Sequence, residues 1–258
     1  MIPRARGLLV LVYVGLTMAL FFFVSIPVML LTGSGTLPMW FARRAWGPSS
    51  LWLAGVRLDV RRLAPIPDGP AIFASNHESA LDILAVVTAL PRTIRFVAKR
   101  ELFRIPVFGW HLWLGGHVMV DRSDHAQAVT SLAEAARKVR SGTSLIVFPE
   151  GTRSRDGLVH PFKKGPFVIA MEAVVPVVPV AVSGAGAINP KGRIEVHPGT
   201  LHVSLGEAVY PRDFPDRTAL LREVRRRVIS MHRETGGLGG DVDDAVAARG
   251  AEGTSAVP

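Results

Sequence analysis

The chain has 258 residues, of which 48% are hydrophobic, and its mean hydropathy is positive, which is oily for a soluble enzyme. Thirty Lys and Arg against 21 Asp and Glu give a formal net charge of +9, which favours contact with anionic headgroups or nucleic acid. Because the chain contains no cysteine, disulfides, thiolate nucleophiles and cysteine-ligated metal sites are excluded.

The N-terminal segment carries no charged residue between Gly7 and Thr36, and residues 8–31 are apolar on every helical face. Such a helix is roughly 36 Å long, enough to cross or deeply enter a hydrocarbon core about 30 Å thick. We expect a membrane-attached helix that Pro27 kinks or ends. The alternatives are a buried core helix or a cleaved signal peptide, although the apolar stretch is long for a signal and lacks a clear Ala-x-Ala site.

In the next segment, residues 37–56, aromatic side chains alternate with arginines. Its tryptophans suit a headgroup boundary, and Arg43 and Arg44 can reach phosphates. We expect this segment to lie in the interface; the alternative is an amphipathic helix docked on the protein's own core. Arginines flank both ends of the apolar helix, and a helix that enters one leaflet or bends back keeps both ends on the cytoplasmic side. Residues 1–55 are therefore predicted to be membrane-associated helices, with the rest of the chain on the cytoplasmic face.

From residue 56 onward short apolar strands alternate with helices, which predicts an α/β domain over residues 56–235. Strands are expected at 56–62, 71–75, 94–98, 118–120, 144–148, 177–182, 194–196 and 203–205, and helices at 81–90, 126–140, 167–173 and 217–233. This order is typical of an open, largely parallel sheet that binds ligands beyond the carboxyl ends of its strands. The tail, residues 236–258, has no apolar period, and we expect it to be disordered.

The first chemical motif is Asn76-His77, with Asp82 five residues after the histidine. On one regular helix these two side chains would lie about 140° apart and would not face each other. We therefore predict that His77 lies in the turn before the helix at 81–90 and that Asp82 projects back from the first turn. The carboxylate then holds one imidazole nitrogen and leaves the other free to take a proton from an alcohol. The alternative is a structural or surface pair, since this spacing also arises by chance.

The second motif, Phe-Pro-Glu-Gly-Thr-Arg-Ser at residues 148–154, follows the strand at 144–148. Its Pro-Glu-Gly turn exposes backbone N–H groups, and Thr152, Arg153 and Ser154 add donors suited to a phosphate. The alternative is a basic surface turn in which Glu150 pairs with Arg153.

Two further stretches fit the same site. Lys99 ends the strand at 94–98 and precedes an apolar wall, and Arg122 follows the strand at 118–120, so both cations emerge where ligands of such sheets bind. Residues 175–180 form an apolar segment with a rigid bend, which we interpret as core or tunnel lining. The remaining histidines show no His-Glu-x-x-His or paired spacing, so we expect neither a metal ion nor a cofactor.

In this order and spacing, the four stretches resemble the conserved blocks of the lysophosphatidic acid acyltransferase family of glycerophospholipid acyltransferases. Its four blocks are similar, in order, to residues 76–82, 99–109 with Arg122, 148–154 and 175–180. The agreement extends over about residues 71–184. The interior of the first block, Glu-Ser-Ala-Leu at 78–81, departs from many relatives. The resemblance implies a mixed, largely parallel sheet flanked by helices, with the N-terminal helices in the membrane.

The resemblance also implies an activity: transfer of a fatty acyl group from acyl-CoA or acyl carrier protein to the free hydroxyl of lysophosphatidic acid, giving phosphatidic acid. It implies that His77 is the general base and Asp82 its orienting partner. The implied acceptor and phosphate site comprises Glu150, Gly151, Thr152, Arg153 and Ser154, assisted by Lys99 and Arg122.

Direct transfer is expected, without an acyl-enzyme, because a thioester is already activated and the chain lacks both cysteine and a Gly-x-Ser-x-Gly elbow. A general base contributes roughly 100- to 10,000-fold to such a step. Two alternatives stay open: the same chemistry on glycerol-3-phosphate, another lysophospholipid or a lyso-aminolipid, and a non-catalytic lipid-binding protein. We expect membrane lipid and no nucleic acid as a partner, since the basic residues accompany apolar helices and no recognition motif is visible.

Overall fold

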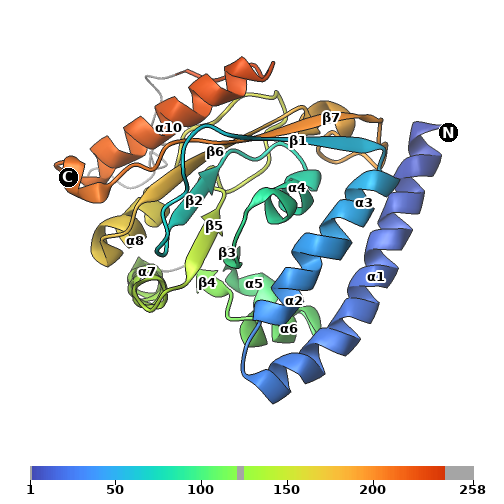
Figure 1. Cartoon of the computed structure of the whole chain (residues 1–258), viewed down its shortest axis with the longest axis horizontal. Helices are drawn as coiled ribbons and strands as arrows, with labels where there is room; N and C mark the ends of the chain where they lie inside the picture. The colour runs from blue at the N-terminus through green and yellow to red at the C-terminus, as the bar shows by residue number, and fades with distance from the viewer. Residues whose placement is uncertain (1, 121–124, 242–258) are drawn as a thin grey trace, which may run out of the picture.

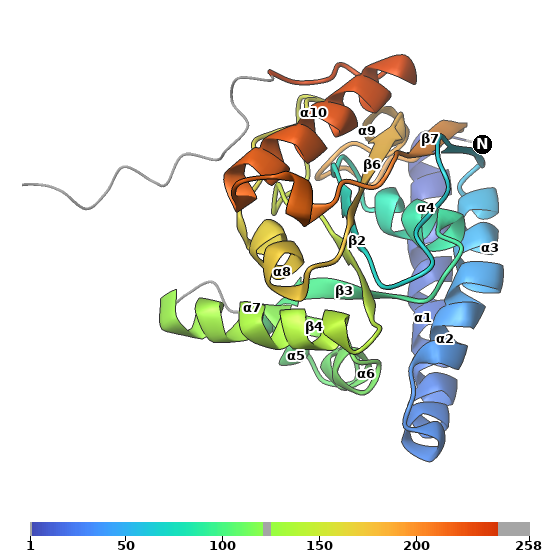
Figure 2. The same ribbon diagram turned by 60° about the vertical axis from the view of Figure 1, so that its left-hand side comes forward.

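The structure, a computed structural model, describes residues 2–120 and 125–241 of the chain. An α/β body surrounds a twisted sheet, and two long helical segments, α1 and α2–α3, run side by side along one edge of that body (Figure 1). A second view shows the α2 end of this pair reaching beyond the body (Figure 2).

The sheet contains seven strands in the order β1-β7-β6-β2-β5-β3-β4. Their bounds are β1 (Val56–Arg62), β2 (Ile72–Ser75), β3 (Ile94–Lys99), β4 (Val118–Val120), β5 (Ser144–Val147), β6 (Val177–Ser183) and β7 (Gly199–Leu205). All neighbouring pairs are parallel except β6 and β7, which are antiparallel. β2, β5 and β6 are buried along their whole length, because helices cover both faces of the central sheet. The expected mixed, largely parallel sheet is confirmed.

Helices cover the sheet on both sides and divide the core in two. The remaining helices are α4 (Leu81–Ala89), α5 (Arg100–Phe103), α6 (Phe108–Leu114), α7 (His125–Arg140), α8 (Gly165–Ala173), α9 (Ala185–Ile188), η2 (Pro211–Asp213) and α10 (Arg217–Glu234). One apolar cluster joins the sheet to α7, α8 and α10, and the other joins it to α4 and the N-terminal helices. The carboxyl ends of β2 and β5 are left between these layers, and both chemical motifs begin there.

α1 (Pro3–Thr32) corresponds to the expected apolar helix, and of the two alternatives expected for Pro27, a kink or an end, the structure excludes the end. A proline removes one backbone hydrogen bond without preventing further turns, and the helix ends where Gly33 adopts a left-handed conformation with φ of 64°. Among the described residues, α1 is the one helix long and apolar enough to cross a membrane, by length and composition. Only 17% of its most apolar stretch is buried.

The second N-terminal segment is α2 (Thr36–Phe41), the π-helical η1 (Ala42–Trp46) and α3 (Gly47–Leu53), which follow one another without a break. Its inner face is docked on the protein's own core, where Leu51 and Ala54 are buried and α3 packs on α4. Its outer face exposes Trp40 and Trp52, the latter by 79%. The interpretation of a helix docked on the core holds for the inner face, whereas a position in the membrane interface stays a prediction for the outer face.

The strand expected at residues 194–196 is absent from the described structure. These residues belong to the loop between α9 and β7, where the side-chain amide of Asn189 donates to the carbonyls of Arg193 and Glu195. A side chain thus satisfies the backbone groups that a neighbouring strand would otherwise satisfy.

The tail that the sequence places from residue 236 onward is described only as far as Asp241. Gly239 accepts a hydrogen bond from Val159 N, and Gly240 accepts one from the guanidinium of Arg233. Residues 242–258 lie outside the described part of the chain.

Candidate active site

His77 lies in the turn between β2 and α4, and Asp82 projects back from the first turn of α4. The distance from His77 Nδ1 to Asp82 Oδ2 is 2.7 Å, as the sequence spacing predicts. The same carboxylate oxygen accepts hydrogen bonds from the backbone N–H groups of Glu78 and Ser79, at 2.7 and 2.9 Å. An oxygen that receives three donors is an acceptor, so Nδ1 carries the hydrogen and Nε2 has a free lone pair.

Burial gives the two members of this pair different environments. The carboxyl group of Asp82 is fully buried, whereas the imidazole of His77 retains 15% exposure. Burial raises the pKa of Asp82, and the hydrogen bond from His77 opposes that rise. The ring of His77 stacks on Phe148, with centroids 4.1 Å apart, so its plane is set by packing as well as by hydrogen bonding.

Asn76 positions the turn that carries His77. Its buried side-chain amide donates to Val182 O and accepts from Val182 N, both at 2.8 Å. The amide therefore extends the β2–β6 pairing by one rung after β2 itself has ended. The sequence motif contains this residue, but its partner is 106 positions away, so no local pattern indicates its role.

The 148–154 loop is bound to the backbone of His77 at two points. His77 N donates to Glu150 Oε1 at 3.0 Å, and Ser154 N donates to His77 O at 2.7 Å. Because β2 and β5 are parallel neighbours, their carboxyl ends bring the two motifs together at one edge of the sheet. Gly151 has φ of 77°, a left-handed conformation that favours glycine at this turn.

Glu150 does not form the ion pair with Arg153 that a simple surface turn would contain, as far as the described residues show. Its side chain is only 5% exposed, and burial raises its pKa to about 8. Of the other loop residues, Thr152 is exposed and Arg153 half-buried, whereas the buried Ser154 donates its hydroxyl hydrogen to Asp156 Oδ1. Arg153 is thus the loop residue best placed to meet an anion.

A third segment, the 189–196 loop, joins both motifs and was not predicted from the sequence. Asn189 O accepts from the hydroxyl of Ser79 at 2.9 Å. Lys191 Nζ donates to Thr152 Oγ1 at 3.0 Å and to the carbonyl of Arg153 at 2.6 Å. A lone lysine after a short helix has no local signature, and only the fold brings it to this loop.

The two cations of the second block are placed differently. Lys99 ends β3 and is exposed at the same sheet edge, but β5 separates its strand from β2. No hydrogen bond or ion pair joins Lys99 to His77 or to the 148–154 loop within residues 2–120 and 125–241. The prediction for Arg122 falls outside the described residues. In the part of the chain that the structure describes, no group of acidic or histidine side chains could hold a metal ion.

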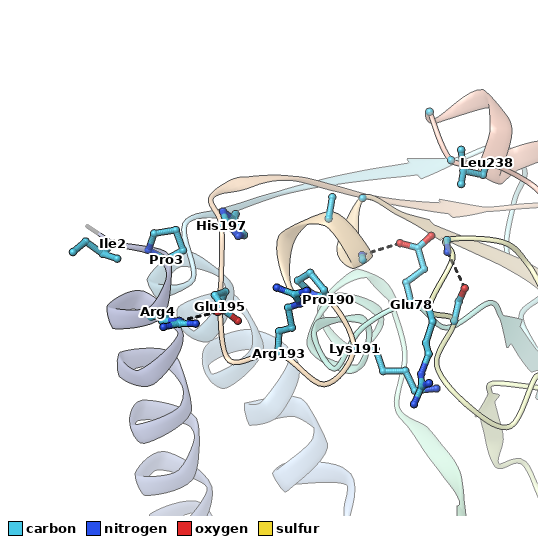
Figure 3. A pocket seen from close by; sticks show the side chains of 18 residues that line it. Ile2, Pro3, Arg4, Glu78, Pro190, Lys191, Arg193, Glu195, His197 and Leu238 are labelled. Atoms are coloured by element: carbon cyan, nitrogen blue, oxygen red, sulfur yellow. Dashed lines mark hydrogen bonds and ion pairs between the residues drawn. The ribbon is translucent and has the colours of Figure 1, made fainter.

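In the described part of the chain, two of the cavities are lined by residues of both motifs. The smaller, about 360 Å³, lies between α1, α4 and the 189–196 loop. Arg153 and Arg193 line it together with apolar side chains that include Val10, Leu81 and Ile194. The larger, about 980 Å³, borders Glu78 and Ser154 (Figure 3).

Comparison with known proteins identifies the family. The family model described as Acyltransferase matches residues 57–183. The 1-acyl-sn-glycerol-3-phosphate acyltransferase alpha of Mus musculus is 35% identical over 199 residues, which cover 73% of this chain and 69% of the mouse protein. The chain belongs to the 1-acyl-sn-glycerol-3-phosphate acyltransferase family. The resemblance inferred from the four sequence blocks is thereby confirmed.

Other members of the family agree in sequence and in fold. The chloroplastic enzyme BAT2 of Brassica napus is 36% identical over 173 residues, or 66% of this chain, and the chain spans 50% of its length. The crystal structure of the 1-acyl-sn-glycerophosphate (LPA) acyltransferase PlsC from Thermotoga maritima superposes with a TM-score of 0.75 at 28% identity. That match covers 90% of this chain and 97% of the other. The chain thus spans about half the length of the plant relative and nearly all of the bacterial structure.

Within this acyltransferase fold the predicted residues divide into two groups. One hydrogen-bonded unit brings together His77, Asp82, Glu150, Gly151, Thr152, Arg153 and Ser154. Lys99 stands at the same edge without contacting this unit. The unit also includes Asn76, Ser79, Asn189 and Lys191, whose partners lie far along the chain.

Proposed function

We propose that this protein transfers a fatty acyl group from a thioester donor, acyl-CoA or acyl carrier protein, to the free hydroxyl of lysophosphatidic acid, producing phosphatidic acid. One observation carries the proposal: an imidazole whose Nδ1 is held by Asp82 lies next to an arginine-bearing loop. General base and anion site are the two elements that attack by a phosphorylated alcohol requires.

The reaction needs no covalent enzyme intermediate. His77 Nε2 removes the hydroxyl proton as the acceptor oxygen attacks the thioester carbonyl, and the Asp82 carboxylate stabilises the resulting imidazolium. The tetrahedral intermediate then collapses with cleavage of the C–S bond. The thiolate leaves, His77 returns the proton to it, and an ester and a free thiol are the products.

The acceptor is proposed to occupy the cavity of about 360 Å³ between α1 and α4. The planar guanidinium of Arg153 suits a phosphate monoester, which it can bind through two parallel hydrogen bonds. The apolar side chains of the same cavity suit the acyl chain that a lysophospholipid already carries. A phosphate at one end and an oily wall at the other favour a lysophospholipid over glycerol-3-phosphate, which has no acyl chain.

The protein is proposed to act at a membrane, with the catalytic domain on the cytoplasmic face. Support comes from the outward-facing apolar surface of α1 and from the exposed Trp40 and Trp52 of the adjacent segment. The net charge of +9 is complementary to the anionic lipids of a cytoplasmic leaflet.

The test uses the purified full chain in mixed micelles with oleoyl-CoA and lysophosphatidic acid, and measures phosphatidic acid by lipid mass spectrometry. His77→Ala is expected to lower kcat by roughly 100- to 10,000-fold, since it removes the general base. Asp82→Asn is expected to lower kcat because it weakens control of the imidazole, and Arg153→Ala to raise the KM for the acceptor. His202→Ala is a matched control, because His202 of β7 forms a similar 2.8 Å bond with Asp59 of the edge strand β1.

Undiminished turnover in His77→Ala, with His202→Ala also active, would exclude His77 as the base. Acceptors presented in competition, namely glycerol-3-phosphate, other lysophospholipids and a lyso-aminolipid, identify the preferred alcohol. Lipid binding without turnover by the wild type would favour a non-catalytic lipid-binding protein, and ping-pong kinetics would contradict direct transfer.

A further inference from the structure

The larger cavity, about 980 Å³, is separate from the proposed acceptor cavity, although Arg193 belongs to the lining of both. It lies beyond the carboxyl ends of β5 and β6, where residues 154–157, the start of α9, the 190–197 loop and the N-terminus of α1 meet. Open sheets bind ligands at this position, and the volume is at the upper end of the range of about 300 to 1,000 Å³ typical of small-molecule sites.

The lining of this cavity has an excess of positive charge. Four basic side chains, Arg4, Arg155, Lys191 and Arg193, face two acidic ones, Glu78 and Glu195. In Figure 3, Arg193 and Lys191 lie between the Arg4–Glu195 pair and Glu78. The excess of two positive charges would attract an anion, provided that the carboxylates are already satisfied.

Both carboxylates are satisfied by the protein itself. Glu78 Oε1 accepts from His232 Nε2 at 2.6 Å, and Glu78 Oε2 accepts from Gly186 N at 3.0 Å. Glu195 accepts a hydrogen bond from Arg4 at 2.9 Å, which lowers its pKa, with a further contribution from Arg193. Both carboxylates thus make their hydrogen bonds within the protein, and the lining keeps its excess of two positive charges.

The cations, in contrast, keep their charge available. Among the described residues, the partners of Lys191 are the neutral oxygens of Thr152 and Arg153. Across residues 2–120 and 125–241, Arg155 and Arg193 form no ion pair with any carboxylate. The nearby Asp156 does not line the cavity, and its Oδ1 is engaged by Ser154 and His160. Three cations thus line one space without an ion pair of their own to a carboxylate in the described part of the chain.

The cavity is also connected to the proposed general base. Glu78 follows His77 directly, and Ser154 donates its backbone N–H to the carbonyl of His77. A ligand that fills the cavity therefore lies next to the peptide segment that carries His77.

We propose, as an extension of the proposed function, that this cavity binds the phosphorylated nucleotide end of an acyl-CoA donor through Arg155, Lys191 and Arg193. Coenzyme A carries a diphosphate and a 3′-phosphate, so its negative charge is concentrated at the end remote from the thioester. Its extended pantetheine arm allows the thioester to reach His77 while the phosphates occupy the cavity. Acyl carrier protein presents a single phosphodiester, and lysophosphatidic acid a single phosphate, which match a cluster of three cations less well.

Binding is tested first without any acceptor, so that the result does not depend on turnover. Coenzyme A and adenosine 3′,5′-bisphosphate are titrated by calorimetry into the full chain in detergent micelles. Arg155→Ala is expected to weaken both ligands by roughly tenfold, as for loss of one charge-assisted hydrogen bond, and Arg155→Glu by more. Arg212→Ala and Arg212→Glu make the same changes at an exposed arginine outside the cavity and should leave both affinities unchanged. Equal coenzyme A affinity in wild type and Arg155→Glu would overturn the proposal.

Kinetics then separate this proposal from the proposed function. In Arg155→Ala the KM for oleoyl-CoA should rise by a similar factor, while the KM for lysophosphatidic acid stays at the wild-type value. An oleoyl thioester of pantetheine lacks the nucleotide, so wild type and variant should use it equally well. A rise in the acceptor KM instead would assign the cavity to the acceptor phosphate and overturn the proposal. Arginine-dependent binding of coenzyme A without acylation of any acceptor would support the nucleotide site and contradict the proposed function.

Discussion

Glu150 is a residue whose burial changes its chemistry. Burial raises its pKa to about 8, so at neutral pH its carboxyl group is largely protonated and adds little negative charge next to Asp82. Its Oε1 still accepts the backbone N–H of His77 in this form. Asp82 is then the carboxylate that stabilises positive charge on the imidazole, and Glu150 fixes the position of the His77 backbone.

The pH dependence of stability reports this environment. Glu150 has a folded-state pKa of about 8, above its ordinary 4.5, so the folded state binds more protons than the unfolded state between these values. Its contribution is complete below pH 4.5 and is lost as pH rises to 8, at about 1.4 kcal/mol per pKa unit. We expect the free energy of unfolding of wild type to fall relative to Glu150→Gln over this range, measured by urea unfolding between pH 5 and 9.

The difference in unfolding free energy between wild type and Glu150→Gln isolates the contribution of Glu150. Burial lowers the pKa of His111 to about 4 and that of His117 to about 3. The contribution of both histidines to the free energy of unfolding therefore decreases as pH falls below 6.5. This opposite trend is common to wild type and variant and cancels. A constant difference in unfolding free energy across the range would show that Glu150 ionises normally.

At the scale of the element, α1 has two unlike faces. One face packs on α6, where Phe22 contacts Phe108 with ring centroids 5.9 Å apart and Ser25 bonds to His111 at 3.0 Å. The other face is free of protein: Leu16 is 68% exposed and Phe23 78% exposed. Seven residues separate these two side chains, which places them on the same side of the helix. An apolar face of this kind is stable in lipid and costly in water.

Charges on the free face should weaken membrane association. Leu16 and Phe23 are both largely exposed, so changing them should leave the core intact. Each of Leu16→Lys and Phe23→Lys would place a charge in hydrocarbon, at a cost of about 3 kcal/mol near the centre of a membrane helix. We expect the double variant to shift from the vesicle-bound to the free fraction in flotation assays, with unchanged circular dichroism. Val129→Lys on α7, at a position 54% exposed, is the matched control. Equal flotation of all three proteins would place this face of α1 away from lipid.

At the scale of the whole molecule, the C-terminal helix supports the N-terminal motif. His232 of α10 is fully buried, and its Nδ1 accepts from Gly239 N at 3.0 Å. Its Nε2 therefore carries the hydrogen and donates to Glu78, which lies 154 positions earlier and next to His77. The backbone N–H of Glu78 in turn holds Asp82. α10, α9 and the catalytic turn are thus one connected unit.

Loss of this connection should affect stability and activity together. His232→Ala leaves Glu78 buried with one partner fewer and opens a cavity, so we expect the free energy of unfolding to fall by about 3 kcal/mol. A double-mutant cycle with Glu78→Gln should show non-additive losses, because both changes alter the same hydrogen bond. Ser230→Ala, at an exposed position of the same helix, is the control. Unchanged unfolding and unchanged turnover in His232→Ala would show that α10 packs independently of the site.

Features that depend on neighbouring residues could be predicted from the amino-acid sequence. Apolar runs and turn residues predicted the strands and helices of the α/β domain, since local periodicity reflects burial on one or both faces. The five-residue spacing of His77 and Asp82 predicted a turn followed by a helix, because on one helix they could not meet. The four ordered blocks identified the family.

Tertiary structure alone decided the contacts between residues far apart in the chain. Strand order and helix placement, which local patterns do not encode, bring Asn76 to Val182 and Glu78 to His232. The same holds for Lys191 on the 148–154 loop and for the 194–196 segment, which Asn189 holds as a loop. A hydrogen bond forms wherever folding brings donor and acceptor together, and chain distance does not enter its energy. The chemical groups can therefore be read from the sequence, whereas the network that aligns them exists only in the fold.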